Sequence, residues 1–307
     1  MEYTIFRLSF SNGIHIGDRS LEKPLFSFCA DTLYSALYIE ANAESTEKAA
    51  WLDQVIREGK LMISDAFPYI KDTEFLPKPI LPIQRDASEK GDSVRKKAFK
   101  KLSFIPLDQM ETFLAGNLDP VEILARLKKL GVAGTKTSAA ISHQEETLPY
   151  HVGTYRFFDG NGLFFIAGVE GNDVYEPFSE LMTALSFSGI GGKRSSGFGR
   201  FEIVGKKKLD SYILEQTGGY YMTLSISLPK EEEMEDVLIN GCYQVLKRGG
   251  FVQSATYAEQ PMKKQELFML SAGSCFKKRY EGDIYDVSLG GSHPVYKYGK
   301  PIFWPLS

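Results

Sequence analysis

Cysteine and histidine are scarce in this chain, and the motifs of metal and hydrolase chemistry are missing. Its 307 residues include three cysteines and four histidines. The cysteines are odd in number and far apart, which predicts buried apolar residues rather than disulfides or zinc ligands. H-E-x-x-H, C-x-x-C and G-x-S-x-G are absent, and no carboxylates are paired at ligand spacing. We therefore expect no metal, no cofactor and no preformed hydrolase site.

Long apolar runs and an excess of positive charge are also missing. No segment is as long and apolar as a membrane span, and the N-terminus lacks a charged-then-apolar signal pattern. We expect a cytoplasmic protein without membrane contact. The net charge of −3 argues against unspecific coating of nucleic acid. Positive charge is instead local, because residues 189–208 hold six cations and one acid, and residues 95–101 hold five cations and no acid. This distribution predicts a defined anionic partner.

The most informative stretch of the chain is 189–200. It has five glycines, three cations, two hydroxyls and no carboxylate. Because glycine has no Cβ, such a loop can bring several backbone N–H groups close to an anion. The candidate binding residues in it are Gly189, Gly191, Gly192, Lys193, Arg194, Ser195, Ser196, Gly197, Phe198 and Arg200. The alternative is a tight connection whose glycines serve only the turn.

The surroundings of this stretch exclude two familiar phosphate-binding motifs. Apolar residues at helical spacing predict a helix over 177–187 before it, and the pattern of 198–204 predicts a strand after it. Walker A loops and dinucleotide fingerprints have the opposite order, with a strand first and a helix last. In addition, Lys193 is followed by Arg194 rather than by serine or threonine.

The first part of the chain predicts a ferredoxin-like module with a long insertion. We expect a strand at 3–10, a helix capped by Asp31, a second helix at 45–58, and a hairpin of strands 150–158 and 163–169. The dense prolines between 67 and 82 predict an irregular surface connection, and 131–148 predicts a mobile or extended segment. With the insertion around 60–150 set aside, the order is β-α-β-β-α-β.

The second part predicts another, degenerate module of the same kind. A boundary near 210–219 divides the chain into domains at 1–210 and 211–307. After it we expect strands at 220–228, 250–256, 266–271, 283–287 and 295–303, and a helix starting near 229. The expected fold class is therefore α+β, with two ferredoxin-like (RRM-like) modules. Such a fold underlies one common RNA-binding domain but does not establish a function by itself.

One histidine is a candidate for chemistry. His15 lies in a glycine-flanked loop after the first strand, where it could act as general acid or base in cleaving RNA at a 2′-OH. Two other interpretations stay open, namely a histidine that contacts a bound base and a histidine that is structural. No catalytic partner for it can be named from the sequence.

Several stretches together resemble a known family. Phe187 to Arg200, with the sequence FSGIGGKRSSGFGR, looks like the glycine-rich loop of the RAMP proteins of CRISPR systems. Further stretches narrow the resemblance, namely His15-Ile16-Gly17, FCADTLYSAL at 28–37, SDAFP at 64–68, FLPKP at 75–79, Gly249-Gly250-Phe251 and HPVYKYGKP at 293–301. The chain is similar to the family of fourth subunits of type III-A (Csm) effector complexes.

This resemblance implies a non-catalytic RNA-binding subunit. Members hold the repeat-derived 5′ handle of the CRISPR RNA, dock a large polymerase-like subunit, abut a backbone RAMP subunit and lie near the target RNA. The family also has a thumb-like hairpin, for which 131–150 is the candidate here. We add Arg248 and Phe251 to the RNA-binding residues. Phe198 and Phe251 are expected to stack on bases or to belong to the core.

Two other functions remain open at this stage. The first is a metal-independent RAMP endoribonuclease that processes CRISPR RNA with His15. The second is a purely scaffolding subunit that does not bind RNA.

Overall fold

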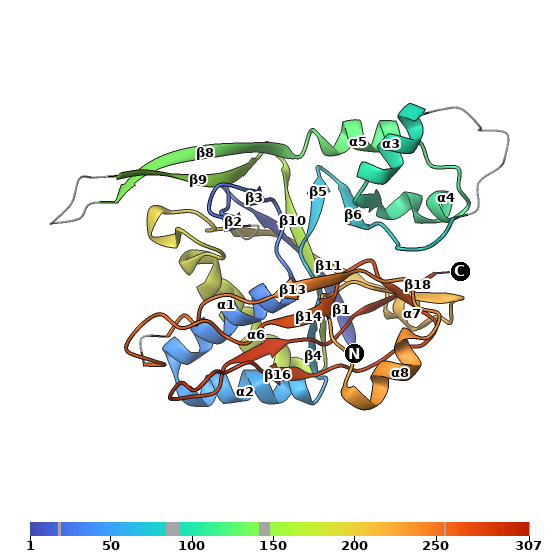
Figure 1. Ribbon diagram of the computed structural model, residues 1–307. Coiled ribbons are helices and arrows are strands. Elements are labelled where there is room, and N and C mark those ends of the chain that lie inside the picture. Colours follow the sequence, from blue (N-terminus) through green and yellow to red (C-terminus); the bar gives the residue numbers. More distant parts are fainter. Residues whose placement is uncertain (18–19, 84–92, 141–147, 255, 307) are drawn as a thin grey trace.

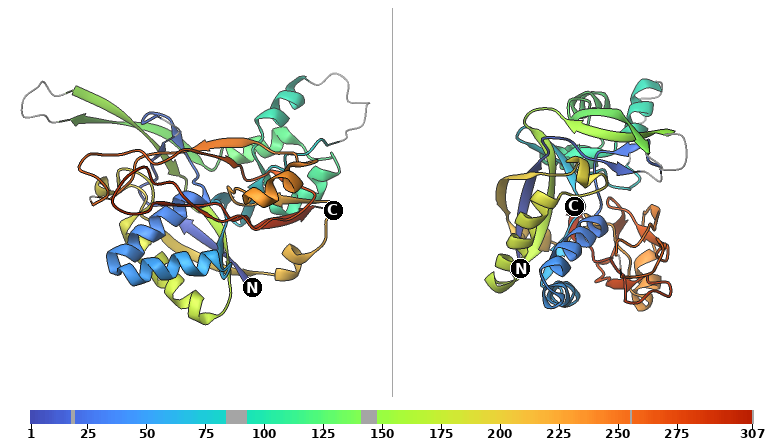
Figure 2. Two further views of the ribbon diagram at one scale, coloured as in Figure 1. Left: turned by 60° about the horizontal axis from the view of Figure 1, so that its bottom comes forward. Right: turned by 90° about the vertical axis from the view of Figure 1, so that its left-hand side faces the viewer.

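The chain folds into a mixed α+β structure with antiparallel sheets (Figures 1 and 2). The computed structural model describes residues 1–17, 20–83, 93–140, 148–254 and 256–306. Among these residues, no helix combines the length and the apolar character needed to cross a membrane.

A seven-stranded sheet forms the centre of the molecule. Its order is β11-β1-β10-β5-β6-β7, and β4 also pairs with β10. The strands are β1 (Glu2–Ser9), β4 (Leu61–Ile63), β5 (Phe67–Ile70), β6 (Thr73–Pro77), β7 (Phe104–Pro106), β10 (Asn161–Val169) and β11 (Glu202–Leu209). Every residue of β10 is buried, which explains its continuous apolar run in place of an alternating pattern.

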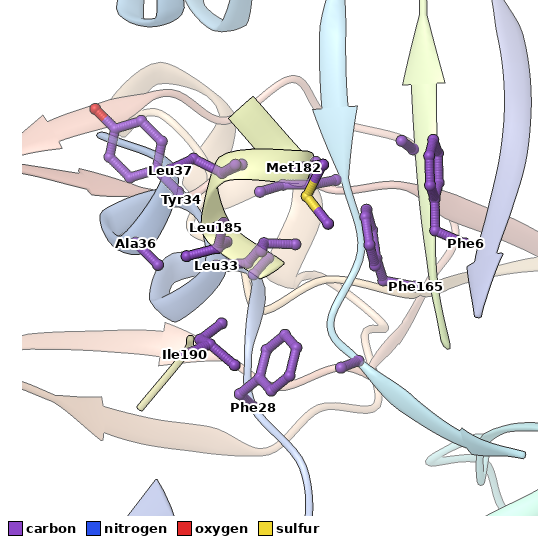
Figure 3. Close-up of a cluster of buried hydrophobic side chains, with 14 of the residues drawn as sticks. Phe6, Phe28, Leu33, Tyr34, Ala36, Leu37, Phe165, Met182, Leu185 and Ile190 are labelled. Atoms are coloured by element: carbon purple, nitrogen blue, oxygen red, sulfur yellow. The ribbon is translucent and has the colours of Figure 1, made fainter. Parts of the chain in front are cut away.

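Three helices cover one face of this sheet and its margin. They are α1 (Ala30–Glu44), α2 (Thr46–Arg57) and α6 (Asn172–Ser188). Leu33 and Leu37 of α1 and Leu185 of α6 belong to one core cluster with Phe6 and Phe165 of the sheet (Figure 3). Burial of each such side chain contributes roughly 1.5–3 kcal/mol. This packing fixes the position at which α6 ends.

A second cluster covers the opposite face. Ile5, Phe164 and Ile166, the alternate residues of β1 and β10, pack there with Met222 and Leu224 from the C-terminal part of the chain. The short helices on this side are α3 (Ser93–Lys101), α4 (Met110–Leu114) and α5 (Pro120–Leu127), with a 3-10 turn at Leu107–Gln109. Asp119 caps α5 through the amide of Val121, as Asp-Pro predicts.

A long ribbon extends away from the body (Figure 1). It consists of β8 (Gly131–Ala140) and β9 (Leu148–Phe157), which pair along their full length. Its base is held by β2 (Ile16–Gly17) and β3 (Pro24–Leu25) and by the reciprocal bond of Ile14 with Tyr155. Most described side chains of β8 are exposed, so the ribbon offers a surface rather than a core.

The C-terminal part has short strands around one small sheet of order β15-β12-β18. Its elements are α7 (Ser211–Glu215), β12 (Tyr220–Thr223), α8 (Glu231–Leu238), β13 (Val245–Arg248), β14 (Leu267–Leu270), β15 (Cys275–Phe276), β16 (Ile284–Asp286), β17 (Tyr296–Tyr298) and β18 (Phe303–Leu306). Asp65 joins this part to α1, because its carboxylate accepts bonds of 2.8 Å from the amides of Ala30 and Ile226. Burial raises the pKa of Asp65 to about 7.

The predicted hairpin of 150–158 with 163–169 is wrong. Both strands exist, and a turn at 158–161 connects them, but β9 pairs with β8 whereas β10 pairs with β1, β4 and β5. The turn falls between the two predicted strands. The partners differ because a strand that is apolar on both faces is buried best between other strands of the central sheet.

The predicted irregular connection at 67–82 is also wrong in its first half. Residues 67–70 and 73–77 are buried strands of the central sheet, so the inserted segment does not begin near 60. Proline removes one backbone donor, but its φ is compatible with an extended chain. Pro68 has a ladder partner, Leu163, on one side only.

Several boundaries differ from the expected ones. Asp31 does not cap α1, whose N-cap is Cys29, but lies in the first helical turn. The helix expected at 177–187 runs from 172 to 188 with Pro177 inside it, and the strand expected at 198–204 begins at Glu202. The strand expected at 250–256 is absent from its described residues, where Phe251 forms an isolated bridge with Lys263. The expectation for 131–148 holds as an extended strand over 131–140, and 141–147 lies outside the described residues.

Candidate nucleic-acid interface

The glycine-rich loop follows directly after α6 and is closed at its base. Gly189 ends the helix with φ 82° and donates to the carbonyl of Leu185. Ile190 donates to Gly199, and Gly199 donates to Gly13, each at 2.9 Å. The side chain of Ile190 is buried in the same cluster as Phe28 (Figure 3). The loop is therefore anchored between two segments that are far apart in the sequence.

Close contact with His15 explains two of the glycines. The amide of Gly192 donates to the carbonyl of His15 at 2.9 Å. A Cβ on Gly192 would lie 2.7 Å from Cδ2 of His15, and one on Gly191 would lie 2.7 Å from the carbonyl oxygen of His15. Contacts this short exclude a larger residue unless the backbone moves. Packing thus accounts for part of the glycine content.

His15 is a buried residue that contacts both the glycine-rich loop and the β8–β9 ribbon. The residue is 7% exposed, and Nδ1 of its ring lies 2.6 Å from the carbonyl oxygen of Gly153 in β9. A carbonyl can only accept, so Nδ1 carries the proton. Within the described part of the chain, no carboxylate or second histidine bonds to the ring. His15 links the loop to the β8–β9 ribbon, as the structural interpretation of this residue requires.

Part of the loop backbone is available to a ligand. The amides of Gly192, Ser196 and Gly197 already donate within the protein. Those of Gly191, Lys193, Arg194 and Ser195 have no backbone acceptor among the described residues. Lys193 has φ 58°, a left-handed conformation followed by a 3-10 turn at Arg194–Ser196. Successive N–H groups in such a sequence of conformations form an anion-binding concavity.

One side of the loop faces the β8–β9 ribbon. Nζ of Lys193 donates to the hydroxyl of Tyr150 at 2.9 Å and lies 4.7 Å from its ring centroid. The hydrogen bond from Lys193 lowers the pKa of Tyr150. Nζ of Lys136 lies 5.5 Å from the ring centroid of the half-buried Phe198. Aromatic and cationic side chains therefore alternate along this edge.

The other side of the loop lines a cavity of about 860 Å³. The remaining walls come from α1, from Thr46 at the start of α2, and from C-terminal residues within 248–254, at 256, at Lys264 and within 293–297. Six residues singled out in the sequence meet here, namely Gly189, Gly191, Gly192, Arg194, Arg248 and Phe251. Phe251 is 56% exposed, so it belongs to the surface rather than to the core.

A buried ion cluster forms part of the cavity lining. Arg248 binds the carboxylate of Asp31 through Nε at 2.9 Å and Nη2 at 2.7 Å, and Nζ of Lys297 binds it at 3.2 Å. Asp31 and Lys297 are each 3% exposed. Burial alone would raise the pKa of Asp31, but the two cations outweigh it and hold that pKa well below its usual range. Arg248 is thus fixed in place by an ion pair.

The predicted site residues divide into four groups. Six line the cavity, while Lys193 and Phe198 face the ribbon and His15 connects the two. Ser195, Ser196 and Arg200 are exposed on the loop, and Gly197 is half-buried. Sequence reasoning did not assign a site role to Asp31, Tyr150, Lys264 or Lys297. Asp31 and Lys297 do lie within the stretches that carried the family resemblance.

Comparisons with known proteins agree with this description. Residues 216–306 match the family model "CRISPR Csm4 C-terminal domain". A protein of Mycobacterium tuberculosis named "CRISPR system Cms protein Csm4" is 37% identical over 100% of this chain and 98% of its own length. A protein of the same name from Streptococcus thermophilus is 33% identical, over 100% and 99%.

Solved structures resemble this chain in fold. A chain in a crystal structure of a Csm3–Csm4 subcomplex of the type III-A CRISPR-Cas interference complex gives a TM-score of 0.66 at 17% identity, with full coverage of both chains. A crystal structure of a Csm1–Csm4 cassette with AMPPNP gives 0.61 at 19% identity, covering 100% of this chain and 98% of that one. With relatives above 30% identity along its whole length, the chain belongs to the Csm4 family of CRISPR proteins.

Proposed function

We propose that this protein is a non-catalytic, cytoplasmic RNA-binding subunit of a type III-A CRISPR effector complex, and that it holds the 5′ handle of the CRISPR RNA. The observation that carries this proposal is the cavity beside the glycine-rich loop. Among the described charged residues that line it, four are cations and one is a carboxylate. A single strand can enter such a site, because its phosphates and unstacked bases are accessible.

The loop and the cavity supply different contacts to the RNA. The unoccupied amides around Lys193 and Arg194 are placed to bind phosphate oxygens, and the two side chains supply charge. Phe251 at the cavity and Phe198 near the ribbon offer ring faces for bases. On this assignment Gly189, Gly191 and Gly192 allow the strand to approach the backbone closely.

The proposed protein partners are a large polymerase-like subunit and a backbone RAMP subunit. Support comes from the solved structures, whose descriptions pair Csm4 with Csm1 in one case and with Csm3 in the other. Exposed apolar side chains suited to protein contacts include Phe187 (73% exposed), Tyr212 (67%) and Phe268 (65%). A net charge of −3 fits a subunit that contacts RNA only locally.

We also propose that 1–210 is a ferredoxin-like unit and 211–307 a degenerate second one. The order β11-β1-β10-β4, with α1 and α6 on one face, is the arrangement that β-α-β-β-α-β connectivity produces. β11 ends at Leu209 and α7 begins at Ser211, in agreement with a boundary there. The β8–β9 ribbon, which extends away from the body, is the proposed thumb, and its proposed ligand is target RNA paired with the guide.

Replacing Lys193 and Arg194 together by alanine is expected to weaken handle binding. Each cation that contacts a phosphate of a single strand contributes about 0.7 to the slope of log affinity against log salt. The double variant should therefore lose about 1.4 units of slope. Fluorescence polarisation with a labelled handle RNA at several salt concentrations measures it. Lys208→Ala is the matched control, since Lys208 is 79% exposed and paired with Glu2. An unchanged slope in the double variant would favour a purely scaffolding subunit.

The endoribonuclease alternative makes a different prediction for His15. If the protein only binds RNA, a labelled repeat RNA incubated with it in EDTA stays intact for wild type and His15→Ala alike. We expect this result, because Nδ1 of His15 is committed to Gly153 and no second acid or base contacts the ring in the described residues. Specific cleavage by the wild type that disappears in His15→Ala would overturn the non-catalytic assignment.

A further inference from the structure

Lys264 is a cation of the cavity that has no counter-ion among the residues the structure describes. Lys264 lines the cavity together with Arg248, Lys297 and Asp31. Its backbone amide donates to the carbonyl of Gly250 at 2.9 Å, which fixes the segment that carries it. The side chain of Lys264 has no hydrogen bond or ion pair within the described ranges of the chain, whereas Arg248 and Lys297 both bind Asp31.

The electrostatic surroundings of Lys264 are unfavourable for its charge. Burial, followed by the charge of Lys297, lowers its pKa to about 8, and Arg248 adds to the effect. Asp31 acts in the opposite direction, but both of its oxygens already accept from the other two cations. The remaining titratable or charged residues of the walls are Tyr34, Tyr38, Arg194, His293 and Tyr296. None of these is a carboxylate, so the described residues of the lining carry more positive charge than they neutralise.

The geometry points to an anion subsite formed by Lys264, Arg248 and Lys297, and we propose that it binds a phosphate group of the guide RNA. This inference rests on the proposed function and deepens it. A lysine ammonium binds phosphate oxygens as a point charge, without the bidentate geometry that fixes Arg248 on Asp31. The amides of the glycine-rich loop form the other anion-binding end of the same cavity.

The size and lining of the cavity favour a nucleotide unit over an isolated ion. Its 860 Å³ lies in the range of pockets that enclose organic ligands. Tyr38, Tyr296 and Phe251 line it, and their ring faces suit bases. A strand that passes from the loop to Lys264 would place successive phosphates at two cationic ends with bases between them.

The test compares Lys264→Gln with a matched control, Lys278→Gln. Lys278 is 62% exposed and paired with Asp236 outside the cavity. Full-length proteins are titrated with three probes, namely handle RNA with a 5′-hydroxyl, the same RNA with a 5′-phosphate, and adenosine 5′-monophosphate. We expect Lys264→Gln to lose about tenfold in RNA affinity and about 0.7 in salt slope, and Lys278→Gln to lose neither. Thermal denaturation checks the fold, which should persist because the substitution removes an unpaired charge.

The pH dependence of RNA affinity provides a second test of the subsite. Because a bound phosphate favours protonated Lys264, binding above pH 8 must take up a proton. From the pKa of about 8, the RNA affinity of the wild type should fall about fourfold between pH 7 and 8.5, and Lys264→Gln should lose this dependence. The control should retain it.

The outcomes separate this inference from the proposed function. If the wild type binds RNA and Lys264→Gln binds it with the same affinity and salt slope, the subsite is overturned, whereas the proposal of handle binding stands. Absence of wild-type RNA binding overturns the proposed function and the RNA assignment with it. If Lys264→Gln weakens the binding of adenosine 5′-monophosphate but not that of either RNA, the assignment to RNA is likewise overturned. If Lys264→Gln weakens the binding of either RNA, the subsite is supported. If it weakens only the binding of the RNA with a 5′-phosphate, the terminal phosphate is the group that is bound.

Discussion

Asp31→Asn is expected to lower the free energy of unfolding by about 3–5 kcal/mol, the cost of breaking a buried ion pair. The substitution keeps the shape of the side chain but removes the only carboxylate that lines the cavity among the described residues. Arg248 and Lys297 would then be left close together without a counter-ion, next to Lys264. Urea unfolding monitored by circular dichroism measures the change.

The pH dependence of this effect follows from the lowered pKa of Asp31. A carboxyl whose pKa is lower in the folded than in the unfolded state stabilises above its unfolded pKa, about 3.9. The difference in free energy of unfolding between wild type and Asp31→Asn should therefore have its largest value at pH 6 and decrease as the pH falls below about 4. A pH-independent difference would contradict the charge-based explanation.

An exposed ion pair provides the control for Asp31. Asp236 is paired with Lys278 at 2.8 Å, and both side chains are more than 60% exposed. Asp236→Asn should change the stability by less than about 1 kcal/mol, because water already solvates both charges. If Asp31→Asn cost no more than this control, the cluster around Arg248 would not be a structural element of the cavity.

The sequence predicted local features of the loop better than their partners in space. Helix, loop and strand occur in the expected order, and four glycines of the loop, Gly189, Gly191, Gly197 and Gly199, have φ between 78° and 89°. The two interpretations of the glycines turned out not to exclude each other. Gly192 packs on His15, whereas the neighbouring amides of Lys193 and Arg194 lack a backbone acceptor among the described residues.

Long-range pairing is where sequence reasoning failed. Asp159 to Gly162 specifies a turn, but no local pattern indicates that β9 pairs with β8 and β10 with β1. The same limit applies to the cavity. Asp31 lies more than 200 positions before Arg248 and Lys297 in the sequence. Their contact therefore depends on how the C-terminal part packs against α1. The family resemblance pointed to these stretches without predicting that they meet.

Gly199→Ala is expected to be among the most disruptive substitutions in the loop. Gly199 has φ 78°, and a Cβ there would lie 2.0 Å from the carbonyl oxygen of Ile190. The left-handed conformation alone costs an alanine about 1–2 kcal/mol. The clash must in addition open the bond between Ile190 and Gly199 that closes the loop. We expect a total loss of about 2–4 kcal/mol, measured by urea unfolding.

The matched control for Gly199 is Gly59, which has φ 74° with no atom within 4 Å of its ideal Cβ. Gly59→Ala should cost only the conformational part, about 1–2 kcal/mol, and leave RNA binding unchanged. Gly199→Ala should also weaken binding of handle RNA by about tenfold at a temperature where it stays folded, because the amides around Lys193 lose their orientation. Equal costs for the two variants would show that the loop can relax around a methyl group. Full RNA affinity in a destabilised Gly199→Ala would separate the loop from RNA recognition and leave the cavity as the binding site.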